Sequence, residues 1–212
     1  MTTVLEKPGT KRRTASKEER QLQLIKATIR SIARHGLSTT TMATVSKEAK
    51  LSQGIINLHF QSKDRLLVET LRYIADEYKS VWEKALRESG DSTAEKIAAL
   101  VGVDFEKSVC QRNKLAVWFA FWGETKSRPI YRDICRKRDR EYRQIMIGYC
   151  ASLIEEGKYQ NLDAEFIATA LLAMTEGLWL DLLMSPEYMR PEQAYKVCMH
   201  YLQTIFPGHF QQ

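Results

Sequence analysis

Two segments of the sequence combine tryptophans with carboxylates in an arrangement that suits cation binding. Trp118 and Trp122 are four residues apart in an aromatic run, so on a helix they share one face. Trp179 stands between Glu176 and Asp181 in a second run. A quaternary ammonium has no N–H to donate, so a protein holds it with aromatic faces and a nearby negative charge. The two segments therefore predict a cation site, unless their aromatic side chains simply fill a hydrophobic core.

A pair of amide side chains has the chemistry needed to recognise DNA. Gln53 and Asn57 lie one helical turn apart, after a short amphipathic segment and a turn at residues 50–54. Two short helices joined by such a turn form a helix-turn-helix. Each amide can donate and accept, as paired hydrogen bonds to an adenine edge in the major groove require. We expect both side chains on the outward face of the second helix, in contact with bases. The alternative is that they contact only solvent.

Basic residues are concentrated at the N-terminal end of the chain. The 212 residues carry a formal charge of +6, but residues 1–65 hold 13 Lys and Arg against 5 Asp and Glu, a net +8. Residues 66–212 hold 19 against 21, a net −2. This asymmetry favours a small module that neutralises phosphates, followed by a domain without that role. Residues 1–17 have no apolar period and predict a flexible basic arm.

Helical periodicity continues through the rest of the chain and predicts an all-α fold. A first helix from Glu18 should end at Gly36, and Ser62 should cap a long fourth helix. The long helix would join a three-helix DNA-binding domain, residues 18–65, to a C-terminal helical ligand-binding and dimerisation domain, residues 66–212. About nine helices are expected, the later ones spanning approximately 42–49, 53–60, 62–87, 92–105, 114–125, 129–156, 163–184 and 191–205.

The segment from Thr41 to Leu67 resembles the DNA-binding motif of the TetR family of transcriptional repressors, including Gly54 and Lys63. The likeness covers residues 18–67. It implies a homodimer that binds a palindromic operator in double-stranded DNA, with two recognition helices in successive major grooves. The resemblance and the amide chemistry together predict these DNA-binding residues: Thr40, Thr41, Ser52, Gln53, Gly54, Asn57, Leu58, His59 and Lys63.

Some of these positions have specific expected roles. By resemblance, Thr40 or Thr41 reaches a phosphate, as does Lys63. His59 stands where the family usually has a phosphate-binding tyrosine. Leu58 departs from the polar residue common at its position, and it either touches a thymine methyl or fills a gap in the small domain.

Packing of the predicted helices can also be anticipated. Small Ala49 would let the second and third helices cross closely, while Val45, Phe60 and either Ile55 or Ile56 would wedge the third helix against the first two. The family resemblance implies dimerisation through the last two helices. An apolar series in the eighth helix could supply the seam, or could equally be intramolecular core: Phe166, Ala170, Leu171, Met174 and Leu178.

The two aromatic segments are similar to the choline-responsive, BetI type of this family, which represses glycine betaine synthesis. That type also shows an Ala-Trp-x-Ala-Phe-Trp run and a Gly-Leu-Trp-Leu run. The resemblance implies choline or a relative such as betaine aldehyde as the effector. The alternative is a repressor of an efflux or catabolic gene that senses other cationic or lipophilic ligands. The expected ligand-binding residues are Trp118, Trp122 and Trp179, followed by Phe119, Phe121, Asp104 and Glu176.

Other classes of protein find little support. No nucleophile elbow, P-loop, H-E-x-x-H or dinucleotide fingerprint occurs, so no catalysis, metal or cofactor is expected. Four widely separated cysteines predict reduced, mostly buried thiols. Without a signal sequence, and with charges interrupting the apolar stretch 166–184, the chain is expected in the cytoplasm and not in a membrane. The mixed charges of residues 132–143 favour a solvated or interdomain surface over a second DNA site.

Overall fold

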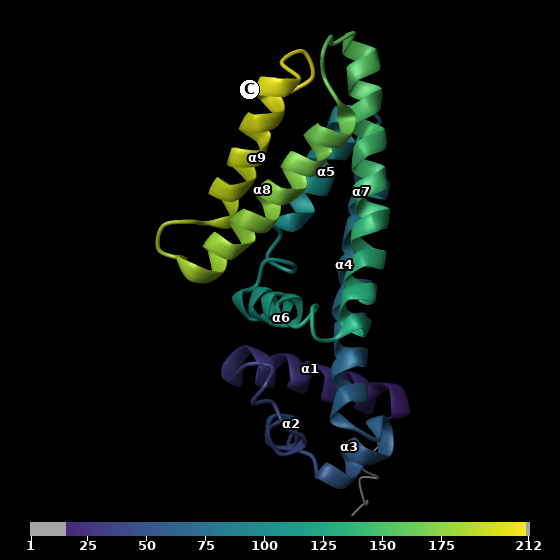
Figure 1. The fold of residues 1–212 in the computed structure, drawn as a ribbon, viewed down its shortest axis with the longest axis vertical. Coiled ribbons are helices and arrows are strands. Elements are labelled where there is room, and N and C mark those ends of the chain that lie inside the picture. Colours follow the sequence, from purple (N-terminus) through teal and green to yellow (C-terminus); the bar gives the residue numbers. More distant parts are fainter. Residues whose placement is uncertain (1–15, 211–212) are drawn as a thin grey trace, which may run out of the picture.

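The hydrophobic pattern of the sequence is realised as helices throughout the described chain. The computed structural model describes residues 16–210, and within that range it contains nine helices and no strand, which confirms the predicted all-α class (Figure 1). Most of the predicted basic arm, residues 1–15, lies outside the described residues. The helices are α1 (Lys17–His35), α2 (Met42–Ala49), α3 (Gln53–Phe60), α4 (Lys63–Glu88), α5 (Thr93–Asp104), α6 (Arg112–Gly123), α7 (Pro129–Gly157), α8 (Ala164–Met184) and α9 (Pro191–Ile205).

Helix boundaries follow capping chemistry where the sequence supplies it. The Ser16 hydroxyl oxygen accepts a hydrogen bond from the Glu19 N–H at 3.1 Å, and the Glu19 carboxylate accepts one from the Ser16 N–H at 2.7 Å. This capping box starts α1 at Lys17, so Lys17 belongs to the helix and not to the predicted arm. No side chain caps α6 at Gln111, and α6 begins and ends two residues earlier than predicted.

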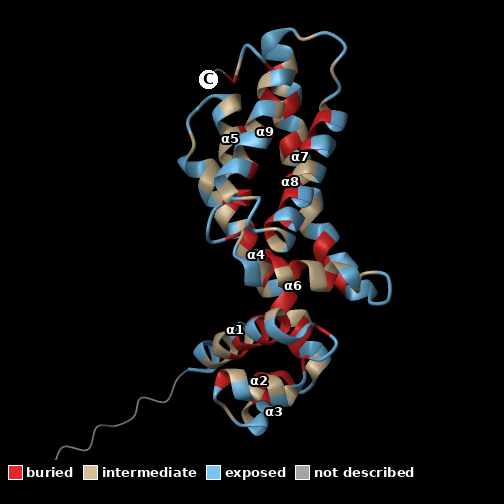
Figure 2. Ribbon diagram, turned by 90° about the vertical axis from the view of Figure 1, so that its left-hand side faces the viewer, coloured by how far each residue is buried: buried red, intermediate tan, exposed pale blue. Residues whose placement is uncertain are grey.

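α1, α2 and α3 pack around a small core of their own, together with the first turn of α4 (Figure 2). Ile56 is fully buried in this core, whereas Ile55 is only partly buried, so Ile56 is the residue that fixes α3 against its neighbours. The predicted positions of Val45, Ala49 and Phe60 in the core are confirmed. The buried members are Leu24, Ala27, Val45, Ala49, Ile56, Phe60 and Leu66.

A second and larger core joins α4 to α9 and also takes in α1. Ile29 and Ile32 of α1 belong to the large core, although Leu24 of the same helix belongs to the small one. The first turn of α4 divides in the same way, with Leu66 in the small core and Leu67 in the large one. Because both cores share α1 and α4, the DNA-binding unit is packed directly against the larger domain.

An ion pair adds to this junction. Arg128, directly before α7, places a guanidinium nitrogen 2.9 Å from the Asp64 carboxylate in the first turn of α4. Both side chains are substantially exposed, at 44% and 70%. A pair in such a setting contributes only about 0–1 kcal/mol to stability, so its effect is to orient the start of α7 over α4.

α8 has one buried and one exposed apolar face. By length and composition alone it could cross a membrane, a test that the core helices of soluble proteins also pass. Leu171 and Leu178 are 1% and 7% exposed, so of the two alternatives for these residues the intramolecular core holds. The opposite face exposes apolar and small residues, namely Phe166, Ala170, Ala173, Gly177, Leu180 and Met184.

Replacing Ile56 with alanine should lower the free energy of unfolding by about 2–5 kcal/mol, because a side chain with no exposed surface is removed from the small core. Leu58 lies in the same helix but is 76% exposed. Leu58→Ala should therefore change the free energy of unfolding by less than about 0.5 kcal/mol. Urea denaturation followed by circular dichroism measures both. Equal destabilisation would contradict the assignment of Ile56 to the core.

Candidate DNA-binding and ligand-binding sites

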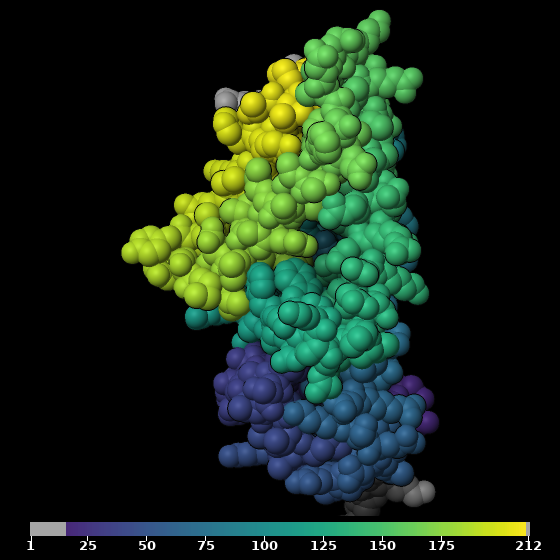
Figure 3. All heavy atoms as spheres, viewed as in Figure 1, coloured from purple at the N-terminus to yellow at the C-terminus, as the bar shows by residue number. Residues whose placement is uncertain are grey.

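α3 turns a mixed polar and apolar surface to solvent near one end of the molecule (Figures 1 and 3). Gln53, Gly54 and Asn57 are exposed, as predicted for the outward face of a recognition helix. Leu58 is 76% exposed, so it does not fill a gap in the small domain. Contact with a thymine methyl is therefore the remaining alternative for Leu58.

The two threonines considered for a phosphate contact differ in exposure. Thr40 is 1% exposed, and its hydroxyl donates to the Gly36 carbonyl at 2.8 Å. Its side chain fastens the connection between α1 and α2 and cannot reach DNA, so Thr40 is corrected from a ligand to a structural residue. Thr41 is exposed and caps α2, where its hydroxyl oxygen accepts from the Thr44 N–H at 3.1 Å. Of the two, only Thr41 offers its side chain to a phosphate.

The other predicted contacts lie around the ends of α3. Ser52 is the N-cap of α3, with its oxygen 3.4 Å from the Ile55 N–H. Lys63 donates from its ammonium to the Ser38 carbonyl at 3.3 Å. His59 is partly buried, and its Nδ1 has no hydrogen-bond partner among residues 16–210. Ser52 and Lys63 thus help to hold the small unit together, in addition to their predicted contacts with DNA.

Trp118, Trp122 and Trp179, the residues predicted to form a cage, come together between α6 and α8. The ring centroids of Trp118 and Trp122 are 6.1 Å apart. Trp122 lies 6.3 Å from Trp179, with the ring planes inclined by only 12°. Phe119 meets Trp122 edge-on at 5.1 Å. Four of the predicted ligand-binding residues therefore form one aromatic cluster.

Phe121 is not part of this aromatic cluster, so the structure gives its predicted role in ligand binding no support. The ring is fully buried and packs edge-on against Tyr131, with centroids 4.9 Å apart. It contributes to the large core instead.

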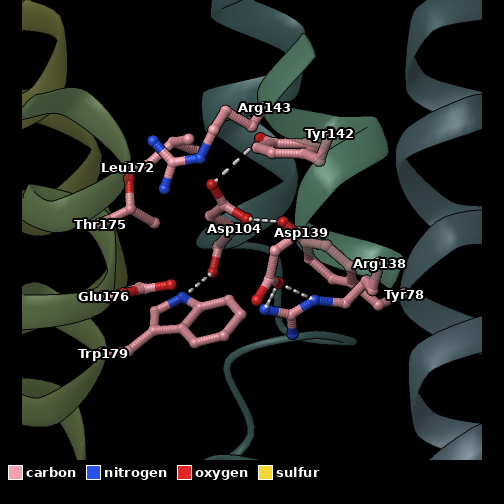
Figure 4. Close-up of a pocket in the computed structure, with 10 residues that line it drawn as sticks. All are labelled: Tyr78, Asp104, Arg138, Asp139, Tyr142, Arg143, Leu172, Thr175, Glu176 and Trp179. Carbon is pink, nitrogen blue, oxygen red and sulfur yellow. Dashed lines mark hydrogen bonds and ion pairs between the residues drawn. The ribbon is translucent and has the colours of Figure 1, made fainter. Parts of the chain in front are cut away.

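Asp104 is the centre of a buried hydrogen-bond network beside Trp179 (Figure 4). Its carboxylate accepts from the Tyr78 hydroxyl, and its second oxygen accepts from the Tyr142 hydroxyl at 3.2 Å. Its backbone carbonyl accepts from the indole N–H of Trp179 at 2.7 Å. Side chains of α4, α7 and α8 therefore meet at a single residue at the end of α5.

A protein cation already lies in the aromatic cluster. The side chain of Arg138 is 8% exposed, and its guanidinium carbon is 4.4 Å from the Trp118 ring centroid. The same carbon is 5.3 Å from the ring of Tyr78 and 5.7 Å from that of Trp122. The Asp139 carboxylate accepts from the Arg138 Nε–H at 2.6 Å. Arg138 is thus an exception to the solvated surface predicted for residues 132–143.

A cavity of about 60 Å³ adjoins this cluster. Glu176, predicted as a ligand residue, lies on its wall together with Asp104 and Trp179. The three carboxylates around it do not form a metal site, since no cluster of three His, Cys, Asp or Glu in the described chain is placed to hold a metal ion.

Burial changes the acid–base behaviour of the carboxyl groups at the cavity. Burial raises the pKa of Asp104 to about 7, although the two tyrosine hydroxyls and Arg138 act in the opposite direction. Burial also raises the pKa of Glu176, and the negative charge of Asp139 adds to the rise. A cation bound nearby favours the ionised carboxylates. A cation that binds at this site should therefore favour the release of protons from the carboxyl groups of Asp104 and Glu176.

Sequence reasoning missed Arg138, Tyr78 and Tyr142 as residues of this site. A signal for Arg138 was present in the helical period of α7. Tyr131, Ile134, Tyr142 and Met146 are all buried, and position 138 continues the same stripe. A charged residue on a buried stripe indicates a partner inside the protein, and Arg138 was hidden by the exposed charges on either side of it.

Comparisons with known proteins identify the family. Residues 24–70 match the bacterial regulatory proteins of the tetR family, and residues 93–207 match the C-terminal domain of BetI-type transcriptional repressors. The chain belongs to the TetR family of transcriptional regulators, and its larger domain is of the BetI type. Regulators of this family bind operator DNA, form homodimers and respond to small-molecule effectors.

Individual relatives are similar over most of their length. The HTH-type transcriptional regulator BetI of Paraburkholderia phymatum is 30% identical over 192 residues, which cover 89% of this chain and 94% of that protein. The BetI of Burkholderia mallei is 28% identical with the same coverage. A transcriptional regulator from Pseudomonas aeruginosa PAO1 is 27% identical, with a TM-score of 0.80 over 93% of this chain and 96% of that one. A regulator from Saccharomonospora viridis, solved in complex with choline, is 22% identical, with a TM-score of 0.79 over 88% and 96%.

Stability should fall as the pH rises from about 4 to 7, because the raised pKa of Asp104 keeps its carboxyl protonated in the folded protein over this range. The folded state then binds more protons than the unfolded chain, so each step towards pH 7 favours unfolding. Asp104→Asn should flatten this part of the profile. Urea unfolding at pH 5 and pH 7.5 measures the effect. Glu176→Gln is the control, because Glu176 is the other carboxyl group at the cavity with a raised pKa. The same pH dependence in wild type and Asp104→Asn would contradict the assignment.

Proposed function

We propose that this regulator represses genes for the conversion of choline to glycine betaine and responds to choline or a closely related quaternary ammonium. It acts in the cytoplasm by binding a palindromic operator as a homodimer, and not by catalysis. The proposal of a cationic ligand rests on one observation, that a buried cation already lies among aromatic rings: Arg138 lies over Trp118, Tyr78 and Trp122.

The chemistry of this cluster supports a positively charged ligand. Cation–π attraction reaches about 2 kcal/mol or more at desolvated sites, and three rings lie within 6 Å of one cationic carbon here. Asp139 supplies negative charge at the same place, and Asp104 and Glu176 are carboxyl groups that a bound cation would favour in the ionised form. The BetI relatives and the choline-bound regulator from Saccharomonospora viridis support choline among the possible cations.

The packing suggests how a ligand in the cluster would act on DNA binding. Tyr78 belongs to α4, and the first turn of the same helix places Leu66 in the core of the DNA-binding unit. A shift of α4 would therefore move the recognition helix and change its distance from that of the second subunit. A coupling free energy of about 1–3 kcal/mol would change operator affinity by about 5- to 150-fold.

The DNA-binding surface is assigned from exposure and chemistry. Gln53, Asn57 and Leu58 project from α3 and are proposed to contact bases, while Thr41 and Lys63 are proposed to contact phosphates. Ser52, Gly54 and His59 would lie at the same interface. Phosphate contacts release counterions, so operator affinity should fall steeply with salt.

The exposed apolar face of α8 is proposed as the seam of the homodimer. Phe166 is 76% exposed and Met184 is 69% exposed, at opposite ends of that face. Val197 of the neighbouring α9 is 43% exposed. Burying such side chains against a second copy is favourable, at roughly 25 cal/mol per Å² of apolar area.

Operator binding should respond to choline. In fluorescence anisotropy at fixed salt, the protein should bind a labelled duplex from its own upstream region tightly, and choline should change the affinity by about 5- to 150-fold. Asn57→Ala should weaken binding to this duplex by about 1–3 kcal/mol and reduce its preference over scrambled DNA. If bulky lipophilic cations release the duplex and choline does not, the effector belongs to the alternative class of cationic or lipophilic ligands. Equal wild-type affinity for scrambled DNA would reject sequence-specific regulation.

Phe166→Glu should dissociate the homodimer, because it places a charge in a desolvated apolar contact. Sedimentation equilibrium should give the mass of two chains for the wild type and of one 24.5 kDa chain for the variant. Glu192→Gln, an exposed change in α9 outside the apolar face, serves as the control. A variant that remains dimeric would remove this face from the seam.

A further inference from the structure

We propose that Arg138 is an internal occupant of the cation site, and that a cationic effector binds by displacing its guanidinium. The identity of the effector rests on the proposed function, but the occupancy of the site by Arg138 does not. Arg138 thereby sets the affinity for the effector and is the first residue to move when the effector arrives.

The guanidinium holds the position that a ligand cation would take. It lies within 6 Å of rings from two helices, Trp118 and Trp122 of α6 and Tyr78 of α4. Its one carboxylate partner is the adjacent Asp139, so the pairing is local to α7 and does not tie α7 to another helix. An arginine that served only to join helices would bridge to a carboxylate on a different element.

The site satisfies this guanidinium incompletely. Asp139 accepts from Nε and Nη2, but the buried Nη1 has no hydrogen-bond acceptor anywhere in residues 16–210. A buried donor without a partner costs free energy. A quaternary ammonium has no N–H and avoids that cost, while it still gains the attraction of the rings. The surroundings of Arg138 therefore match a cation without donors better than they match Arg138.

The occupied ring faces require displacement. The guanidinium carbon of Arg138 lies 4.4 Å from the Trp118 ring centroid and 5.3 Å from that of Tyr78, which leaves no room for a second cation between them. The ligand can reach the faces of Trp118 and Tyr78 only when the guanidinium leaves them.

A destination for the displaced side chain lies on the other side of Arg138. A second cavity, of about 290 Å³, opens between α4 and α7, and Arg138 lines this cavity as well as the first. Asp76 and Glu141 line it, together with the cations Arg72, Lys79 and Lys137, and Glu141 is already paired with Lys79 at 2.6 Å. Rotation about the Arg138 side-chain bonds would carry the guanidinium towards Asp76. The effector would thus place a positive charge between α7 and α4, the helix that leads into the DNA-binding unit.

The test removes the internal occupant and compares two probes. Isothermal titration calorimetry with choline and with ethylguanidinium is carried out on the wild type and on Arg138→Ala and Arg140→Ala. Arg140→Ala makes the same change of charge at an exposed position in the same helix. If the guanidinium blocks the site for at least about nine-tenths of the time, Arg138→Ala should bind choline at least about tenfold more tightly than the wild type. Ethylguanidinium should bind Arg138→Ala and not the wild type, because it refills the vacated position. Arg140→Ala should behave as the wild type.

The outcomes separate this proposal from the proposed function. Choline binding that is equal or weaker in Arg138→Ala than in the wild type would overturn internal occupancy and leave choline as the effector. Binding of ethylguanidinium to Arg138→Ala, with no choline binding by any form, would support occupancy and remove choline. No binding of either probe to Arg138→Ala would overturn occupancy. If Arg138→Ala does not fold by circular dichroism, Arg138→Gln keeps most of the side-chain volume without the charge, and the same outcomes apply to it.

Discussion

The rest of the structure depends on the shared packing of α4 in two cores. Leu66 and Leu67 are neighbours in the chain, yet one is buried in the DNA-binding unit and the other in the larger domain. Ile29 and Ile32 anchor α1 to the larger core in the same way. Close-packed interiors transmit displacement because they have little free volume to absorb it. A small molecule bound in the larger domain can therefore act on DNA binding without touching the recognition helix.

The proposed displacement would begin in the buried polar cluster. Isolated charges are costly inside a protein, and here Asp104 and Arg138 are both removed from water. Asp104 is held by hydroxyls from two helices, and Arg138 by rings from two helices and by Asp139. A change in the position of Asp104 would alter contacts with α4, α7 and α8, and a change in the position of Arg138 would alter contacts of α7 with α4 and α6. Since α6 also packs on α1, both routes to the DNA-binding unit begin at this cluster.

Much of the fold was predictable from the sequence, because helical periodicity and caps such as Ser62 and Asp163 are local signals. The exposure of Gln53 and Asn57 and the shared helix face of Trp118 and Trp122 were predictable for the same reason, whereas the approach of Trp179 to them was expected only from the family resemblance. The burial of individual side chains was not predictable: Thr40 turned inward, Phe121 faced the core and Arg138 entered the aromatic cluster. These outcomes depend on contacts between segments distant in sequence, and the exposed charges on either side of Arg138 concealed its position.

The most direct test of the account is the affinity of choline for the free protein and for the protein bound to its operator, both measured by calorimetry at the same salt concentration. Linkage requires that each ligand changes the affinity of the other by the same factor. The account predicts that operator binding shifts the choline affinity by about 5- to 150-fold, matching the shift of operator affinity caused by choline. Equal choline affinities for the free and operator-bound protein would contradict it, because the cation site and the recognition helix would then be energetically independent.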